Sequence, residues 1–141
     1  MSRPVVVDTM VASSWLGARQ TLTQARWAPV LDSTSWVLPF VVVAEIQFGA
    51  EVAEWGRRRR SALDRLVWSA TVVPPLDEIT RAYVDLRTWC VRAGHGLGAK
   101  HHEADRWIGA VALAAQLPLA SDDAIFRGIP GLVLLTPLDG T

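Results

Sequence analysis

The chain has a single cysteine, no net charge and no long hydrophobic run, and each shortage excludes a class of protein. Cys90 alone cannot form an intramolecular disulfide, which favours a reducing cytosol over secretion. No apolar run reaches the roughly 20 residues needed to cross a bilayer, because Pro39 and Glu45 interrupt the longest stretch. The Met-Ser-Arg-Pro start lacks the layout of a signal peptide. We therefore expect a cytoplasmic protein with no membrane partner.

The signatures of several enzyme classes are also missing. Three histidines and two acids within residues 95–105 could suggest a zinc site, yet no HExxH or paired-cysteine spacing is present. No G-x-S-x-G motif surrounds Ser13 or Ser14, and Cys90 lies on the apolar stripe of a helix, so a nucleophilic residue is lacking. The chemistry must come from other side chains.

What is present is a hydrophobic chain with balanced charge. Half of the 141 residues are hydrophobic, and 14 basic residues match 14 acidic ones. A chain of this length can bury roughly two-thirds of its unfolded surface, so we expect one domain over residues 1–141. Zero net charge argues against a general nucleic-acid coat protein, but it permits a basic patch beside an acidic pocket.

Strand-like and helix-like segments alternate along the chain. The patterns predict strands at 4–8, 71–73, 119–120 and 132–135, and helices at 9–20, from 21 to near Pro29, from about Pro39 to 55, and at 57–70, 76–94 and 103–117. This alternation predicts an α/β protein, a three-layer α/β/α domain with a mostly parallel central sheet. Four of the seven tryptophans, at positions 15, 68, 89 and 107, have helical spacings that predict the core or a dimer interface.

Acidic residues interrupt the apolar segments at four places. They are Asp8 at the end of the first strand, Glu45 as the only charged residue between Ser33 and Ala50, Asp105 at the start of an apolar helix, and Asp122 with Asp123 after a short strand. Any one of them could be a helix cap or a turn residue. Because parallel strands place their carboxyl ends at one edge, we expect the acids to converge there. Oxygen ligands of this kind suit Mg²⁺ or Mn²⁺ better than zinc.

Four segments resemble the motifs of the PIN-domain nucleases, and specifically the VapC-like toxins of bacterial type II toxin–antitoxin systems. They are VVVDTMVASSWL, VVVAEIQFGAE, DRWIGAVALA and LASDDAIFRGIPGL, in this order along nearly the whole chain. The resemblance implies that Asp8, Glu45, Asp105 and Asp123 are the acidic quartet, with Thr9 and Ser121 as nearby hydroxyls for ligands or water. Family members often carry an acid before the phenylalanine of the last motif, whereas this chain has Ile125 before Phe126. Asp122 and Asp123 therefore both stay open as the metal ligand.

The resemblance also implies an activity and partners. The expected function is an Mg²⁺- or Mn²⁺-dependent endoribonuclease toxin that activates water against RNA phosphodiesters, acts as a homodimer and is neutralised by a VapB-like antitoxin. Two alternatives stay open: a non-catalytic PIN-like module that binds RNA or protein, and a metal-dependent DNA nuclease. The fold alone does not separate them.

Basic residues supply candidates for RNA contact. The run Arg57, Arg58, Arg59 and Arg60 could follow an RNA backbone or could be a solvated helix start. A helix N-terminus disfavours cations, so a reason other than helix stability is indicated. Arg106 lies beside the predicted acidic edge in the sequence and is a further candidate for phosphate contact.

Overall fold

The computed structural model describes residues 2–137 and contains a five-stranded parallel sheet. The strands are β1 (Arg3–Val7), β2 (Thr34–Pro39), β3 (Thr71–Val73), β4 (Leu119–Ala120) and β5 (Leu134–Leu135). Their order across the sheet is β3-β2-β1-β4-β5, and every neighbouring pair is parallel. β1 is therefore central, which agrees with its three fully buried valines, Val5, Val6 and Val7.

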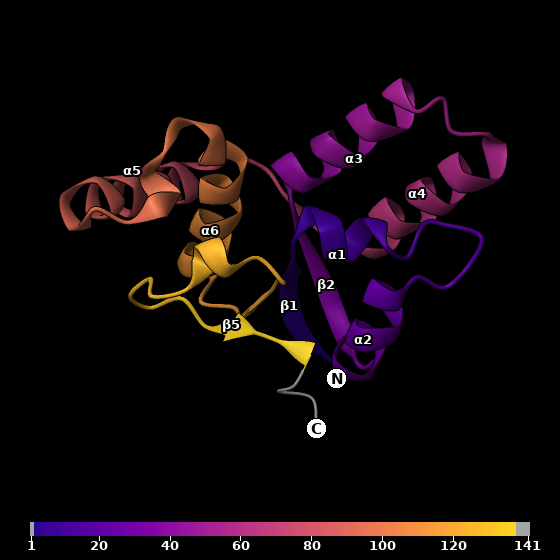
Figure 1. Cartoon of the computed structure of the whole chain (residues 1–141), viewed down its shortest axis with the longest axis horizontal. Coiled ribbons are helices and arrows are strands. Elements are labelled where there is room, and N and C mark those ends of the chain that lie inside the picture. Colours follow the sequence, from indigo (N-terminus) through magenta and orange to yellow (C-terminus); the bar gives the residue numbers. More distant parts are fainter. Residues whose placement is uncertain (1, 138–141) are drawn as a thin grey trace.

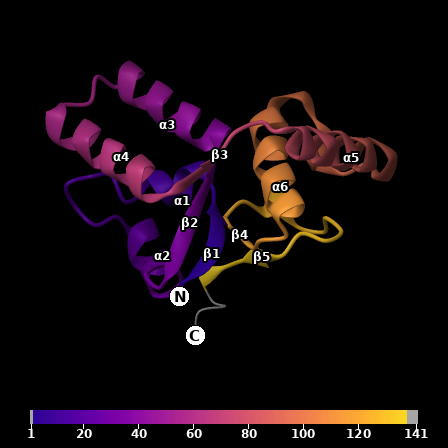
Figure 2. The ribbon, with the colours of Figure 1, turned by 180° about the vertical axis from the view of Figure 1, so that it is seen from behind.

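Helices lie on both sides of β1 and β2 (Figures 1 and 2). They are α1 (Thr9–Ser13), α2 (Leu22–Leu31), α3 (Phe40–Val52), α4 (Arg57–Ser69), α5 (Asp77–Ala93) and α6 (Glu103–Ala115), with short 3₁₀ turns η1 (Gly96–Gly98), η2 (Lys100–His102) and η3 (Ala124–Phe126). The predicted three-layer α/β/α fold with a parallel sheet is confirmed. None of the helices in residues 2–137 has the length and apolar character that crossing a membrane requires.

Three local features differ from the sequence-based expectations. The first helix, expected over 9–20, ends at Ser13, and residues 14–19 form turns and bends. β2 was not predicted, because its apolar residues run without a polar break into those of α3, and the strand and helix periods merge. α2 does not end near Pro29 but continues to Leu31, and the backbone N–H of Asp32 still bonds to the carbonyl oxygen of Ala28 at 2.9 Å. A proline this close to the C-terminus of a helix removes only one hydrogen bond.

The core packs the sheet against α6 on one side and α1 and α2 on the other. Ile108, Ala110, Val111 and Ala112 of the apolar helix α6 are almost fully buried. Trp27 of α2 is fully buried as well. Trp68 of α4 is 89% exposed, so a core position for it is wrong, and the other predicted position, a dimer interface, stays a prediction. Its side chain lies on the outer face of α4, where helical spacing alone does not distinguish the buried stripe from its neighbour.

Candidate active site

The acidic site lies where the strand order of the sheet reverses. From β1 the chain builds β2 and β3 on one side, and it later returns to place β4 on the other side of β1. The carboxyl ends of β1 and β4 are joined by a hydrogen bond from the Asp8 N–H to the Ala120 carbonyl at 3.2 Å. Such a reversal leaves a crevice at the carboxyl edge of a parallel sheet. Asp8 and the Asp122-Asp123 pair share this edge, as the sequence predicted.

Asp8 is the buried acid of the site. Its side chain caps α1 by accepting a hydrogen bond from the Val11 N–H at 3.0 Å, and the residue is only 7% exposed. Burial raises the pKa of Asp8 from 3.8 to about 6, against a lowering by hydrogen bonds from Ser121 and Val11. The charges of Asp122 and Asp105 are smaller contributions to this raised pKa, so these carboxylates lie within electrostatic reach of Asp8.

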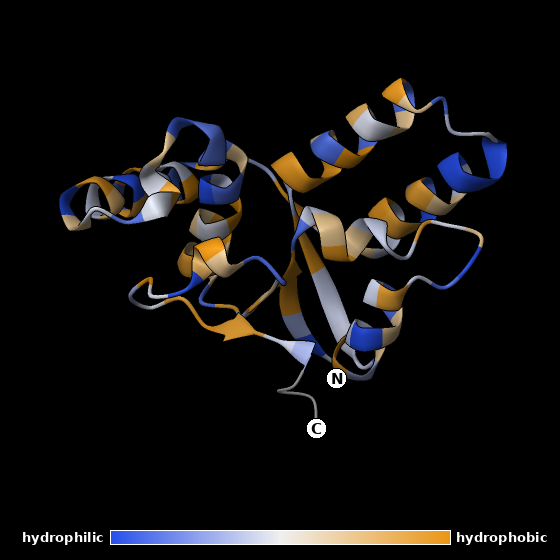
Figure 3. Cartoon of the chain, viewed as in Figure 1, coloured by the Kyte–Doolittle hydropathy of each residue, from blue (hydrophilic) through white to orange (hydrophobic). Residues whose placement is uncertain are grey.

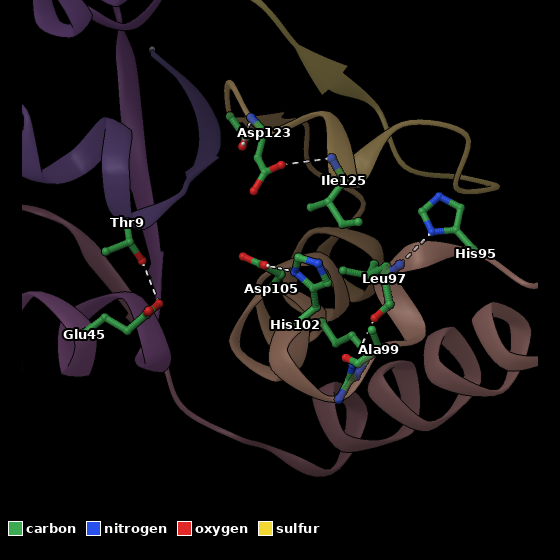
Figure 4. Close-up of polar contacts among 11 residues, drawn as sticks. Thr9, Glu45, His95, Leu97, Ala99, His102, Asp105, Asp123 and Ile125 are labelled. Carbon is green, nitrogen blue, oxygen red and sulfur yellow. Dashed lines mark hydrogen bonds and ion pairs between the residues drawn. The ribbon is translucent and has the colours of Figure 1, made fainter.

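Glu45 reaches the site from the second turn of α3, which begins directly after β2. Its Oε1 atom accepts a hydrogen bond from the Thr9 hydroxyl at 2.9 Å (Figure 4). Thr9 is the residue after Asp8, so this contact fixes Glu45 relative to the end of β1. The Thr9 hydroxyl thus orients an acidic side chain and leaves the second carboxylate oxygen of Glu45 without a protein partner among residues 2–137.

Asp105 lies in the first turn of α6, where the helix dipole favours a carboxylate. The Nδ1 atom of His102 donates to its Oδ2 atom at 2.8 Å, and both side chains are about three-quarters buried. Figure 4 shows Asp105 and Asp123 extending into the same space from α6 and from the segment between β4 and η3. The Thr9–Glu45 pair faces that space from α1 and α3.

The two adjacent aspartates have different surroundings. Asp122 accepts hydrogen bonds from Arg26 at 3.2 and 3.3 Å and from the indole Nε1 of Trp27 at 3.0 Å. Asp123 caps η3 with one oxygen, which accepts from the Ile125 N–H at 3.0 Å, while its own N–H donates to Ser121 Oγ at 3.0 Å. Both oxygens of Asp122 are therefore engaged by α2, whereas Asp123 keeps one oxygen for a ligand.

The donor set fits a hard divalent cation, although the side chains do not yet form a closed ligand shell. Among residues 2–137, no three His, Cys, Asp or Glu side chains lie close enough together to hold one metal ion. Glu45, Asp105 and Asp123 each spend one carboxylate oxygen on a protein donor and retain the other. These free oxygens lie near the buried Asp8, which the charges of Asp122 and Asp105 repel. Such a set of oxygen ligands suits Mg²⁺ or Mn²⁺.

Arg106 does not belong to the site, and its assignment as an RNA contact is wrong. Its side chain is 1% exposed and lies in the core. The guanidinium donates to the carbonyl oxygens of Leu97 at 2.9 Å and Ala99 at 2.6 Å, and to the Tyr83 hydroxyl at 3.4 Å. It ties the loop before α6 to α5 and α6, a long-range role that its position after Asp105 does not reveal.

The four consecutive arginines form the first turn of α4, as predicted, but they do not lie at the acidic edge (Figure 1). The Arg60 side chain is held by contacts within the protein. It forms an ion pair with Glu51 at 2.9 Å and donates a hydrogen bond to the Trp55 carbonyl oxygen at 2.8 Å. Arg59 stacks on the Trp55 ring at 3.7 Å from its centroid. Only Arg57 and Arg58 of this run are free of such contacts within residues 2–137.

Three residues that support the acids were not recognised as such from the sequence. His102 stands three positions before Asp105, a spacing that one helical turn brings together, so this pair has a local signal. Arg26 and Trp27 contact Asp122 across about 95 positions of sequence, and no local pattern indicates this. Their partnership depends on how α2 packs over the sheet.

Comparisons with known proteins agree with this arrangement. The PIN-domain family matches residues 5–132. A curated relative, VapC ribonuclease Y4jK of Sinorhizobium fredii, is 28% identical over 141 residues, which cover 94% of this chain and 96% of that protein.

Solved structures of VapBC and FitAcB share the fold. VapBC2 from Rickettsia felis, bound to a promoter DNA fragment, superposes with a TM-score of 0.76 at 20% identity over 94% of this chain and 98% of that one. FitAcB from Neisseria gonorrhoeae has a TM-score of 0.75 at 22% identity, over 95% of this chain and 98% of its own. DNA-bound VapBC from Salmonella typhimurium has a TM-score of 0.77 at 16% identity, over 97% of this chain and 99% of its own. With its acids at the sheet edge and a family match over most of its length, the chain belongs to the PIN-domain family.

Proposed function

We propose that this protein is an Mg²⁺- or Mn²⁺-dependent endoribonuclease of the VapC type. The observation that carries the proposal is that Asp8 follows the central strand at the switch point of a PIN-domain sheet, within electrostatic reach of Asp105, while Glu45 and Asp123 face the same space as Asp105 (Figure 4). The curated VapC ribonuclease supports the choice of RNA as substrate. Asp8, Glu45, Asp105 and Asp123 would hold the metal. Of the two adjacent aspartates that the sequence left open, Asp123 and not Asp122 would be the ligand.

The protein's own residues prepare the site for an anionic substrate. A divalent cation bound there neutralises the phosphodiester and lowers the pKa of the attacking water. Thr9 holds Glu45, and His102 holds Asp105, so two carboxylates keep their orientation before any ligand arrives. Ser121 donates toward Asp8 and accepts from the Asp123 N–H, which couples the ends of β1 and β4.

The decisive experiment for this proposal compares nucleic-acid substrates. Purified protein is incubated with single-stranded RNA, the same sequence as DNA, and a small phosphate diester, each with Mg²⁺ or Mn²⁺. Internal cleavage of the RNA alone is the expected result. Cleavage of DNA in preference to RNA would replace the proposal with a DNA nuclease. Binding of RNA without cleavage, at metal concentrations shown to load the protein, would replace it with a non-catalytic binding module.

We infer that a VapB-like antitoxin and a second copy of the chain are the protein partners. The solved neighbours are toxin–antitoxin complexes, which supports the first. α3 supports a protein partner independently, since only Val42, Ile46 and Ala50 of this apolar helix are buried while Phe48 and Val52 are about 70% exposed. Light scattering of the toxin alone and with antitoxin is the test. A monomer that binds no antitoxin and is not inhibited by it would contradict both inferences.

A further inference from the structure

A basic hollow lies beside the first turn of α4, outside the acidic site. It has a volume of about 530 Å³ and is lined by residues that follow α1 and by the start of α4, among them Trp15, Gly17, Arg57, Arg58, Arg59 and Arg65. Figures 1 and 2 both show the loop after α1 next to the beginning of α4. Figure 3 colours this first helical turn as strongly hydrophilic. The hollow therefore joins two segments that are about 40 positions apart in the sequence.

The positive charge of the hollow is not neutralised by the protein. Within residues 2–137, Arg57, Arg58 and Arg65 have neither an ion pair nor a hydrogen bond from their guanidinium groups, in contrast to Arg60, which pairs with Glu51. No acid stands in the first turn of α4. Because the helix dipole disfavours cations in the first turn of α4, the unpaired Arg57 and Arg58 do not stabilise the helix, and Arg65 lies two turns further along it. Their charge is available to an anionic ligand.

An aromatic ring beside these arginines favours a nucleic acid over an acidic peptide. Trp15 lines the hollow, and its edge-to-face contact with Trp36 at 4.9 Å between centroids holds the ring in place. Single-stranded nucleic acids are bound by grooves that combine cations for the backbone with aromatic faces for the bases. An acidic peptide would need only the arginine charges and not the aromatic ring.

The hollow is connected to the acidic site by α1. Asp8 caps the N-terminus of this helix, and Trp15 lies two residues beyond its last residue, Ser13. Five helical residues span only about 8 Å. A strand positioned for cleavage at Asp8 therefore reaches the Trp15 side of the hollow within a few nucleotides. We propose that the hollow binds backbone phosphates of single-stranded RNA on one side of the cleavage point, an inference that rests on the proposed ribonuclease function.

The test measures RNA binding as a function of salt. In an Asp8→Asn background, which prevents cleavage, the triple variant Arg57→Gln/Arg58→Gln/Arg65→Gln is compared with a matched variant, Arg3→Gln/Arg81→Gln/Arg92→Gln, which removes the same charge from exposed positions elsewhere. Fluorescence anisotropy of a labelled single-stranded RNA gives the affinity. For the hollow variant we expect at least a tenfold weaker affinity and a log–log salt slope smaller by about 2, since each lost phosphate contact removes about 0.7. The matched variant should bind like its parent.

A cleavage assay with Asp8 intact separates the possible failures. The hollow variant should raise KM for a long RNA while kcat stays within about twofold, because its residues do not touch the scissile bond. Equal binding and equal KM in the hollow and matched variants would overturn this inference alone. Intact RNA after incubation with the metal-loaded parent protein would overturn the ribonuclease proposal itself. Loss of antitoxin binding with full RNA binding would assign the hollow to an acidic peptide and also overturn the inference.

Discussion

The indole N–H of Trp27 donates a hydrogen bond to Asp122 at 3.0 Å, and this contact separates the roles of two adjacent aspartates. Trp27 is fully buried in α2, so it turns Asp122 toward that helix. Arg26 engages the same carboxylate from the same helix. Asp123, the next residue, extends toward Asp105 in the first turn of α6 (Figure 4). One aspartate thus anchors the loop after β4, and the other keeps one carboxylate oxygen free of protein hydrogen bonds within residues 2–137.

Substitution of Asp123 should therefore lower mainly the rate of cleavage, whereas substitution of Asp122 should lower mainly the stability. Asp123→Asn keeps an oxygen for the Ile125 N–H but removes a ligand charge, so we expect cleavage to fall by about 100-fold or more with little change in stability. Asp122→Asn weakens charge-assisted hydrogen bonds and should lower the free energy of unfolding by about 1–2 kcal/mol, with less than a tenfold loss of cleavage. Urea unfolding and initial cleavage rates give both values. The reverse ranking would identify Asp122 as the ligand.

The raised pKa of Asp8 predicts how stability depends on pH in the absence of metal. The folded protein holds the proton of Asp8 up to about pH 6, whereas the unfolded chain releases it near pH 3.8. The protonated carboxyl therefore favours the folded state below pH 4, and this contribution is lost as the pH rises through 6. The loss amounts to about 3 kcal/mol for a shift of this size.

Asp8→Asn isolates this effect from the other titrating groups. Asparagine can still cap α1, but it carries no charge to desolvate. With EDTA present, we expect the variant and the parent to be equally stable at pH 4 and the variant to be more stable at pH 7.5, by up to about 3 kcal/mol. Urea unfolding at four pH values measures the difference. A variant less stable than its parent at pH 7.5 would contradict the burial and repulsion described for Asp8.

The Thr9 hydroxyl should matter for cleavage and not for the fold. Thr9→Val keeps the shape of the side chain and removes the hydrogen bond to Glu45, so we expect cleavage to drop by about 10-fold, the lower end of what an orienting partner contributes. Thr9→Ser retains the hydroxyl and should restore most of the rate. Initial rates at saturating metal, together with melting temperatures, provide the comparison. A Thr9→Val variant as active as the parent, or a Thr9→Ser variant as impaired as Thr9→Val, would contradict this role of the hydroxyl.

Arg106 should be essential for stability. Arg106→Ala leaves the carbonyl groups of Leu97 and Ala99 without their donor and opens a cavity beside Tyr83. We expect the free energy of unfolding to fall by about 3–5 kcal/mol. Arg92→Ala, at an exposed position of α5, is the control and should change it by less than about 0.5 kcal/mol. Similar values for the two variants would refute a structural role for Arg106.

Sequence patterns placed Asp8 and the Asp122-Asp123 pair at one edge of the sheet because the signals for this placement are local. A carboxylate directly after a buried strand, as at Asp8, or inside an apolar helix, as at Glu45, is unusual enough to be noticed in isolation. The parallel sheet then determines that the strand ends meet. The end of the helix expected at 76–94 is equally local, since Gly94 has the left-handed φ of +69° that glycine favours.

The features that escaped prediction depend on contacts between distant segments. Arg106 carries the same sequence signal as an exposed arginine, and only the packing of α5 against α6 shows that its guanidinium is enclosed. The division of roles between Asp122 and Asp123 depends on Arg26 and Trp27, about 95 positions away. Strand β2 was hidden because its apolar residues continue into α3 without a break.

The most direct test of the account is a metal-removal experiment on RNA cleavage. Parent protein is stripped with EDTA, assayed on a defined single-stranded RNA, and assayed again after Mg²⁺ or Mn²⁺ is restored, with Asp8→Asn treated in parallel. We predict no cleavage after stripping, recovery of discrete products with either ion, and no products from Asp8→Asn at any metal concentration. Cleavage that persists in EDTA, or that survives in folded Asp8→Asn protein, would contradict the proposal that the acidic site binds a metal and cuts RNA.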